Sequence, residues 1–135
     1  MSSGEPEPAL EIDVLGPSRV PLEEIERLLA LALASAGIDV GHVAVEFVSA
    51  ERIAELNAAH RDEHAPTDVL SFPIDGAESS PGPRELGDIV ICPEHTTDLR
   101  EAIVHGALHL TGMDHETDEG EMLALQREIM MWVTP

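Results

Sequence analysis

The chain has no lysine and no tyrosine, one cysteine, and only two phenylalanines and one tryptophan. The single cysteine, Cys92, excludes an internal disulfide and fits a reducing compartment. The longest apolar run, Leu28 to Ala34, is far shorter than the roughly 20 residues that a membrane span requires. The N-terminus shows no basic region followed by an apolar one, the pattern of a secretory signal. We therefore expect a soluble cytoplasmic protein that has no membrane partner.

Positive charge is also scarce, because seven arginines oppose 27 acidic residues and the formal net charge is −20. This balance is typical of a strongly solvated acidic surface. It disfavours general binding to nucleic acid, because contacts to phosphates need a basic patch. An arginine that contacts a phosphate must therefore act locally, against the overall field.

The pattern of apolar residues predicts an α+β fold in a single domain. Residues 1–8 are expected to form a disordered tail, and residues 9–135 are long enough to bury a core without disulfides. Alternating or continuous apolar residues predict strands over 9–16, 42–48 and 86–92, and a short strand that follows a loop within 65–74. Helical spacing predicts helices over 22–37, 49–59 and 97–111, and a last helix that ends near 132. We expect a small four-stranded mixed sheet covered by about four to five helices.

Several residues are expected to mark the ends of these elements. Ser49 is a candidate N-cap, Pro93 closes a strand, and Gly112 ends the helix before it. Asp118 and Glu121 resemble a capping box for the last helix. Four residues are expected to form the inner face of that helix: Met122, Leu125, Ile129 and Trp132.

The segment HGALHLTGMDH carries three histidines, His105, His109 and His115. The first two are four residues apart, so on a helix their imidazoles lie on one face, one turn apart. The glycine break at Gly112 lets the chain turn back, so that His115 returns to the same point. Three nitrogen ligands leave a fourth coordination position open, which is the arrangement of a catalytic zinc site. The segment therefore predicts one zinc ion per chain.

The spacing H-x-x-x-H-x-x-G-x-x-H matches that of the metzincin metalloproteases, except at one position. These enzymes place a general-base glutamate directly after the first histidine, where this chain has Gly106. A glycine cannot accept a proton or pass it to a leaving amine. The site is better suited to an alkoxide leaving group or to a substrate that brings its own nucleophile, and RNA offers both. Whether a water or a 2′-hydroxyl attacks is left open.

Three segments occur together and in this order: LNAAHRDEHAPTDVLSFP (56–73), LGDIVIC (86–92) and HGALHLTGMDH (105–115). In this combination the chain closely resembles the bacterial YbeY family, the metal-dependent endoribonucleases of rRNA maturation. The resemblance covers nearly the whole chain, from the first strand to Trp132. It implies a mixed α/β fold, a cytoplasmic location and zinc held by the three histidines.

The resemblance also implies an essential arginine, which maps onto Arg61, and a role in 16S rRNA maturation and quality control of the small ribosomal subunit. A guanidinium at this position could grip two phosphate oxygens at once. The family usually has a tyrosine where this chain has His60, and often has lysines where this chain has Glu63 and Ala65. The stretch from Pro93 to Glu101 is also shorter than usual.

Other residues have simpler interpretations. Asp114 either orients a ligand histidine or caps the turn after Gly112. Asp68 and Asp88 stand at strand starts, where local hydrogen bonds explain them. Cys92 is expected to be a small buried strand residue.

Three functions remain in competition. The first is a metal-dependent endoribonuclease that cuts single-stranded rRNA. The second is a metal-dependent hydrolase of another ester or amide, which the metzincin spacing favours and Gly106 disfavours. The third is a ribosome-assembly protein whose zinc is structural, which the open coordination position disfavours.

Overall fold

The computed structural model describes residues 10–61, 67–74 and 84–133. Its four strands form one mixed sheet with the order β1-β2-β4-β3. They are β1 (Leu10–Leu15), β2 (Gly41–Phe47), β3 (Val69–Pro73) and β4 (Glu85–Ile91). The first, second and fourth strands run parallel, and β3 pairs antiparallel with β4 at the edge. The predicted mixed sheet is therefore confirmed, while the expected tail and most of the loop before Glu85 lie outside the described residues.

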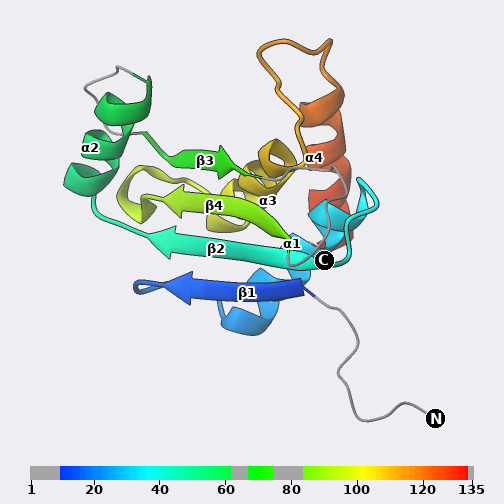
Figure 1. Ribbon diagram of the computed structural model, residues 1–135, viewed down its shortest axis with the longest axis horizontal. Helices are drawn as coiled ribbons and strands as arrows, with labels where there is room; N and C mark the ends of the chain where they lie inside the picture. The colour runs from blue at the N-terminus through cyan, green and yellow to red at the C-terminus, as the bar shows by residue number, and fades with distance from the viewer. Residues whose placement is uncertain (1–9, 62–66, 75–83, 134–135) are drawn as a thin grey trace.

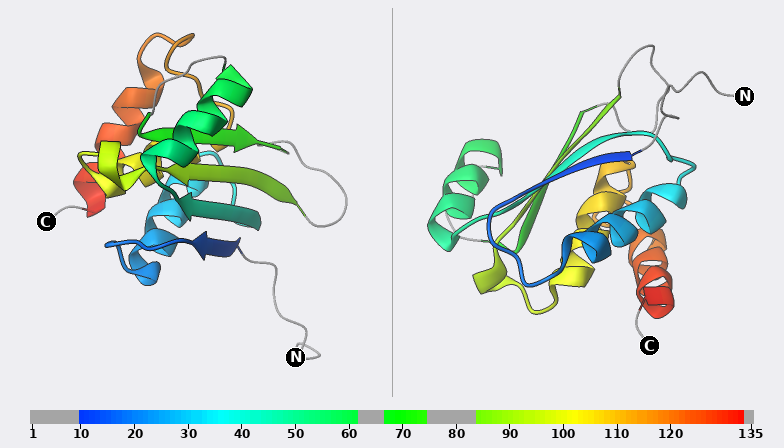
Figure 2. Two further views of the ribbon diagram at one scale, coloured as in Figure 1. Left: turned by 90° about the vertical axis from the view of Figure 1, so that its left-hand side faces the viewer. Right: turned by 90° about the horizontal axis from the view of Figure 1, so that it is seen from below.

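Three helices cover one face of the sheet and the fourth lies against the other (Figures 1 and 2). The helices are α1 (Leu22–Ala34), α2 (Ala50–Arg61), α3 (Leu99–Leu110) and α4 (Glu121–Val133), with a 3₁₀ turn η1 (Pro93–His95) before α3. Seen from below, α1, α3 and α4 lie together on one side and α2 stands alone on the other (Figure 2). Within the described residues, no helix is long and apolar enough to cross a membrane.

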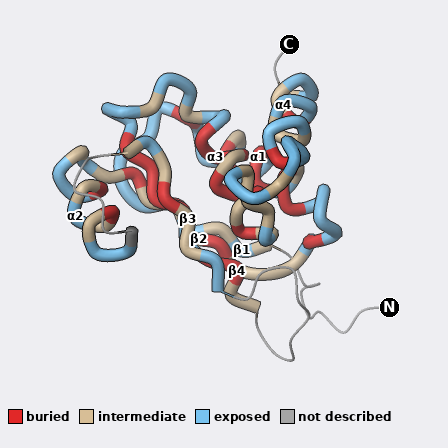
Figure 3. Tube along the Cα trace, turned by 90° about the horizontal axis from the view of Figure 1, so that it is seen from above, coloured by how far each residue is buried: buried red, intermediate tan, exposed pale blue. Residues whose placement is uncertain are grey.

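The face beneath α1, α3 and α4 carries the main core, and we call it the covered face. Alternate residues of the central strands point into it and are buried: Val43, Val45, Phe47, Ile89 and Ile91. They pack against buried residues of the helices, among them Leu29, Leu33, Ile103 and Leu108. The buried part of the trace runs through the central strands and these helices (Figure 3). Burial of this much apolar surface is the main stabilising term of the fold.

Among the described residues, the opposite face, which we call the open face, is covered only at one end, by α2 (Figure 2). A small cluster there joins Ile53 of α2 to Leu70, Val90 and Cys92. Cys92 is fully buried directly after β4, as expected. Farther along the strands, every second side chain points to the open face. Several of these side chains are charged.

The expected helix ends are mostly confirmed. The Ser49 hydroxyl accepts the N–H of Arg52 at 3.1 Å, and Gly112 has φ +100 after the end of α3. Asp118 accepts the N–H groups of Gly120 and Met122. Glu121 accepts the N–H of Glu119 instead of that of Asp118, so the start of α4 is a variant of the predicted capping box.

The expected place of Trp132 on the inner face of α4 is wrong, because its side chain is 60% exposed. Met122 and Ile129 are fully buried, and Leu125 and Val133 are partly buried against the core. A step of four from Ile129 leads to Val133, which stays on the inner face. A step of three leads to Trp132, which turns away from it at the end of the helix.

Candidate metal centre

The two helical histidines stand on α3, one turn apart. Asp98 caps this helix, because its carboxylate accepts the N–H groups of Arg100 and Glu101. The helix therefore begins at Leu99, two residues later than expected. Its other side is fixed by apolar packing, in which Ile103, Ala107 and Leu108 are fully buried. This packing leaves His105 and His109 together on the other side of the helix.

The third histidine reaches the other two because the chain reverses after α3. The N–H of Gly112 donates to the carbonyl of His109 at 3.0 Å, and the positive φ of Gly112 turns the chain back. The ring centroid of His115 then lies 5.0 Å from that of His105 and 5.3 Å from that of His109. One ring nitrogen of each histidine lies within 4.8 Å of those of the others. The predicted convergence of the three imidazoles is therefore present.

Hydrogen bonds on the outer side of two rings determine which nitrogen faces the cluster. Nδ1 of His105 lies 2.7 Å from Oε1 of Gln126, and Nδ1 of His109 lies 2.9 Å from the carbonyl oxygen of Met113. Both partners are acceptors, so each Nδ1 must carry the proton. Each Nε2 then keeps a free lone pair, which is the form that binds a metal.

The environment of His109 favours its neutral form. Its pKa lies below the usual value, chiefly because the ring is partly buried and also because His105 is adjacent. The hydrogen bond to Met113 and the Asp114 carboxylate act in the opposite direction, but they do not reverse the shift. A neutral imidazole needs no deprotonation before it can serve as a ligand.

Gly106 has a structural role that the motif alone does not reveal. It is buried, and a Cβ at this position would lie 2.6 Å from Cγ2 of Ile89 and 3.3 Å from Oγ of Ser71. Its carbonyl also accepts the Ser71 hydroxyl at 3.2 Å. The helix thus packs directly against β4 and β3 at this point. A side chain at this position would have to displace that of Ile89, so close packing also disfavours a glutamate here.

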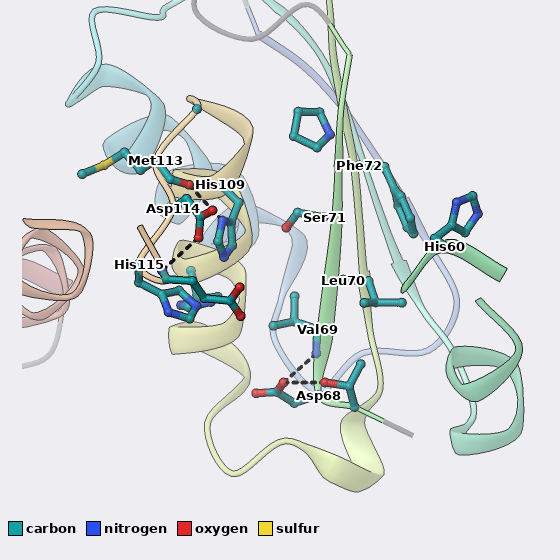
Figure 4. A pocket seen from close by; sticks show the side chains of 15 residues that line it. His60, Asp68, Val69, Leu70, Ser71, Phe72, His109, Met113, Asp114 and His115 are labelled. Carbon is teal, nitrogen blue, oxygen red and sulfur yellow. Dashed lines mark hydrogen bonds between the residues drawn. The ribbon is translucent and has the colours of Figure 1, made fainter. Parts of the chain in front are cut away.

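The histidines stand at one wall of a cleft of about 770 Å³. The edge strand β3 forms the opposite wall, with Ser71 pointing toward the histidines and Phe72 pointing away toward His60 (Figure 4). His60, on α2, also lines the cleft, and its ring contacts that of Phe72. The cleft is therefore built from both halves of the chain, around a cluster suited to a metal.

Comparisons with known proteins agree on one family. The profile of the family described as Endoribonuclease YbeY matches residues 18–133. The chain belongs to the YbeY family.

A Rubrobacter xylanophilus protein described as Endoribonuclease YbeY is 41% identical over 121 residues, which covers 85% of this chain and 87% of that protein. A Macrococcus caseolyticus protein with the same description is 41% identical over 128 residues, with coverage of 81% and 83%. The solution structure of a Thermotoga maritima protein matches with a TM-score of 0.54 and 31% identity, with coverage of 87% and 85%. Both the resemblance drawn from the motifs and the predicted α+β fold are confirmed.

The sequence predicts that Arg61 binds a phosphate. It is the last residue of α2, and its side chain lies outside the described part of the structure. Its role therefore stays a prediction. The next residue back along the helix, His60, is exposed and lines the cleft.

The carboxylate of Asp114 accepts the N–H of Glu116 at 2.9 Å, which is the turn-capping interpretation. Among the described residues it forms no hydrogen bond to a histidine ring, so the orienting role stays a prediction. That role belongs to Gln126 for His105. Gln126 was missed in the sequence, although a polar residue beside Leu125 on the inward side of α4 was a signal that could have indicated it.

The two strand-start aspartates behave differently. Asp68 accepts the N–H of Val69 at 2.9 Å, so the expected local hydrogen bond is present. Asp88 lies in the middle of β4 and is exposed, and its carboxylate forms no hydrogen bond within the described residues. The expectation of a strand-start role is wrong for Asp88, because β4 begins three residues earlier.

Proposed function

We propose that the protein is a zinc-dependent endoribonuclease that cuts single-stranded rRNA, acting in the cytoplasm in 16S rRNA maturation and quality control of the small subunit. The observation that carries this proposal is the convergence of His105, His109 and His115 on one point at the wall of an open cleft. Membership in a family described as endoribonucleases supplies the substrate class.

The residues present fit a zinc ion. Three imidazole nitrogens are ligands that zinc favours, and three protein ligands would leave one coordination position for a substrate or water oxygen. The two outer hydrogen bonds, from His105 to Gln126 and from His109 to Met113, hold the rings in the required tautomer. A divalent ion held there would act as a Lewis acid on a phosphate oxygen.

The protein's own residues would bind and orient the RNA. We infer that Arg61 holds the scissile phosphate, because the family resemblance implies an essential arginine at this position and a guanidinium can grip two phosphate oxygens at once. This local cation matters because the formal charge of −20 repels RNA elsewhere on the surface. No carboxylate follows the first histidine, which disfavours peptide hydrolysis and favours a substrate with a good leaving oxygen.

The direct test is cleavage of a labelled single-stranded rRNA fragment, with casein as the control substrate. Cleavage of the RNA alone, lost with a chelator and restored by zinc, supports the proposal. Cleavage of casein would instead favour a metallopeptidase. Intact RNA together with chelator-sensitive melting would favour a ribosome-assembly protein with a structural metal.

The same assay tests Arg61. Arg61→Ala should lower the rate by about 10²–10³, as expected for loss of one donor to a charged transition state. Arg61→Lys should recover only part, because an ammonium cannot make the two-pronged contact. Arg127→Ala, on the exposed side of α4, is the matched control and should cut at the wild-type rate. Wild-type cleavage by Arg61→Ala with bound metal intact would remove Arg61 from the site.

A further inference from the structure

A second hollow, of about 500 Å³, lies on the open face next to the metal-centre cleft. His60 and Phe72 line both hollows, so the two adjoin at these residues. Phe72 and Leu70 point from β3 toward the α2 side, whereas Ser71 points toward the histidines (Figure 4). An extended chain that crosses the edge of β3 can therefore occupy both hollows at once.

The floor and one wall of this second hollow suit a flat aromatic ligand. Leu56 and Val90 contribute apolar surface. The rings of His60 and Phe72 lie 4.8 Å apart at 62°, with His60 exposed and Phe72 partly buried. Phe72 is the only phenylalanine, tyrosine or tryptophan among the described residues that line either hollow. Unpaired bases of RNA stack on such rings.

Two carboxylates stand at the edge of the same surface. The sheet register pairs Asp88 with Phe72 on one side and with Ala44 on the other, so the carboxylate lies beside the aromatic ring. Glu46 lines the hollow from β2. Within the described residues, neither carboxylate forms a hydrogen bond or an ion pair. They differ in this from Asp13, which pairs with His42 on the same face.

The chemistry of these groups discriminates between bases. An ionised carboxylate only accepts hydrogen bonds, so it matches the amino groups of cytosine, adenine and guanine. Uracil donates only through its N3–H, and it presents a carbonyl oxygen at the position where cytosine presents its amino group, so a carboxylate that faces this position would disfavour uracil. Acidic residues that weaken RNA binding elsewhere would here select among bases.

We propose that this second hollow is a nucleobase subsite. It takes the base of a nucleotide next to the scissile phosphate, stacks it on His60 and Phe72, and uses Asp88 to favour bases that carry an amino group. The subsite rests on the proposed endoribonuclease function, because the neighbouring cleft must hold the phosphate.

The experiment compares cleavage and fluorescence-anisotropy binding of single-stranded oligocytidylate, oligoadenylate and oligouridylate by the zinc-loaded full chain. Wild type should cut the first two about tenfold faster than the third, the discrimination expected of a good contact to a base edge. Asp88→Asn should bring these ratios toward one, because an amide can also donate. Phe72→Leu should weaken all three by at least about fivefold through lost stacking.

Asp39→Asn is the matched control, because it removes the same charge from an exposed residue outside both hollows. It should leave the ratios unchanged, while any general gain from lower negative charge appears in both variants. Glu46→Gln gives a second test at the same wall, and melting temperatures show that each variant is folded.

Equal cleavage of the three oligonucleotides by wild type, or ratios unaltered in Asp88→Asn, would overturn the subsite and leave the endoribonuclease function standing. Failure to bind or cut any of them with zinc present would overturn both.

Discussion

The two faces of the sheet are built from alternate residues of the same strands, yet they serve different purposes. On the covered face, Val45 and Ile89 are fully buried beneath α1, α3 and α4. On the open face, Glu46 and Asp88, their immediate neighbours in sequence, line a hollow. The first face fixes the helix that carries His105 and His109, and the second carries the proposed nucleobase subsite. Consecutive residues of one strand therefore contribute to different properties, one to the stability of the core and the next to the proposed subsite.

The largest expected difference between the faces is in stability. Ile89→Ala should lower the free energy of unfolding by about 2–5 kcal/mol, because it leaves a cavity in the main core. Asp88→Ala, one residue earlier, should change it by less than about 0.5 kcal/mol, as for other exposed positions. Urea denaturation of both variants measures the contrast. Similar losses for the two would show that the open face is also part of the folding core.

A smaller effect, on zinc affinity, is expected at Gln126, where α4 contacts the candidate metal centre. Gln126→Leu removes the acceptor for Nδ1 of His105, so the ring can rotate or change tautomer. Zinc affinity should fall by about 10–100-fold, as for other outer partners of ligand histidines. Competition with a chromophoric chelator measures this. Gln126→Glu, which keeps an acceptor, should bind zinc at least as tightly as wild type.

The melting temperature of the metal-free Gln126→Leu variant should remain close to that of wild type, which separates positioning from folding. Unaltered zinc affinity in this variant would show that α4 contributes packing alone to the site.

The smallest effect concerns the charged residues of the open face. His42 lies between Asp13 and Glu85, with ring nitrogens 2.7 and 2.8 Å from their carboxylate oxygens. These hydrogen bonds, to Asp13 first and then Glu85, raise the pKa of His42 above its usual value. A raised pKa in the folded state means that the stabilisation is complete below about pH 6.5, the unfolded value, and is lost as the pH rises through the folded value.

Because His42 is partly exposed, its two hydrogen bonds together are expected to stabilise the fold by less than about 1 kcal/mol. Comparison of wild type with His42→Gln by urea denaturation at acidic and alkaline pH measures it. The stability advantage of wild type should shrink as the pH rises. An advantage that grows with pH would contradict the assignment of a charged His42.

The patterns that repeat in the sequence predicted most of the fold. Alternation predicted the strands and the residues that share a face. The spacing of His105, His109 and His115 predicted the histidine cluster. Both features depend on local geometry. Which face is covered depends on packing between distant segments, so the open position of Asp88 could not be read from alternation.

The role of Gly106 could be predicted only in part, because it also depends on packing between distant segments. The motif indicates that a glutamate is missing, but the contact with Ile89 depends on how α3 packs against the sheet. Gln126 depends on the docking of α4 beside α3, which no local spacing specifies. Trp132 lies off the inner face of α4 because, at the end of the helix, a step of four from Ile129 stays on that face and a step of three leaves it.

The most direct test of the central claim, that the three histidines hold a metal on which RNA cleavage depends, is a titration of metal-stripped protein with zinc. Bound zinc and cleavage of a single-stranded rRNA fragment are measured on the same samples. Both should rise together and saturate at one ion per chain, and His109→Ala should show neither stoichiometric binding nor cleavage, because two nitrogens remain. Full cleavage by the metal-stripped protein, or zinc-dependent cleavage by His109→Ala equal to that of wild type, would contradict the claim.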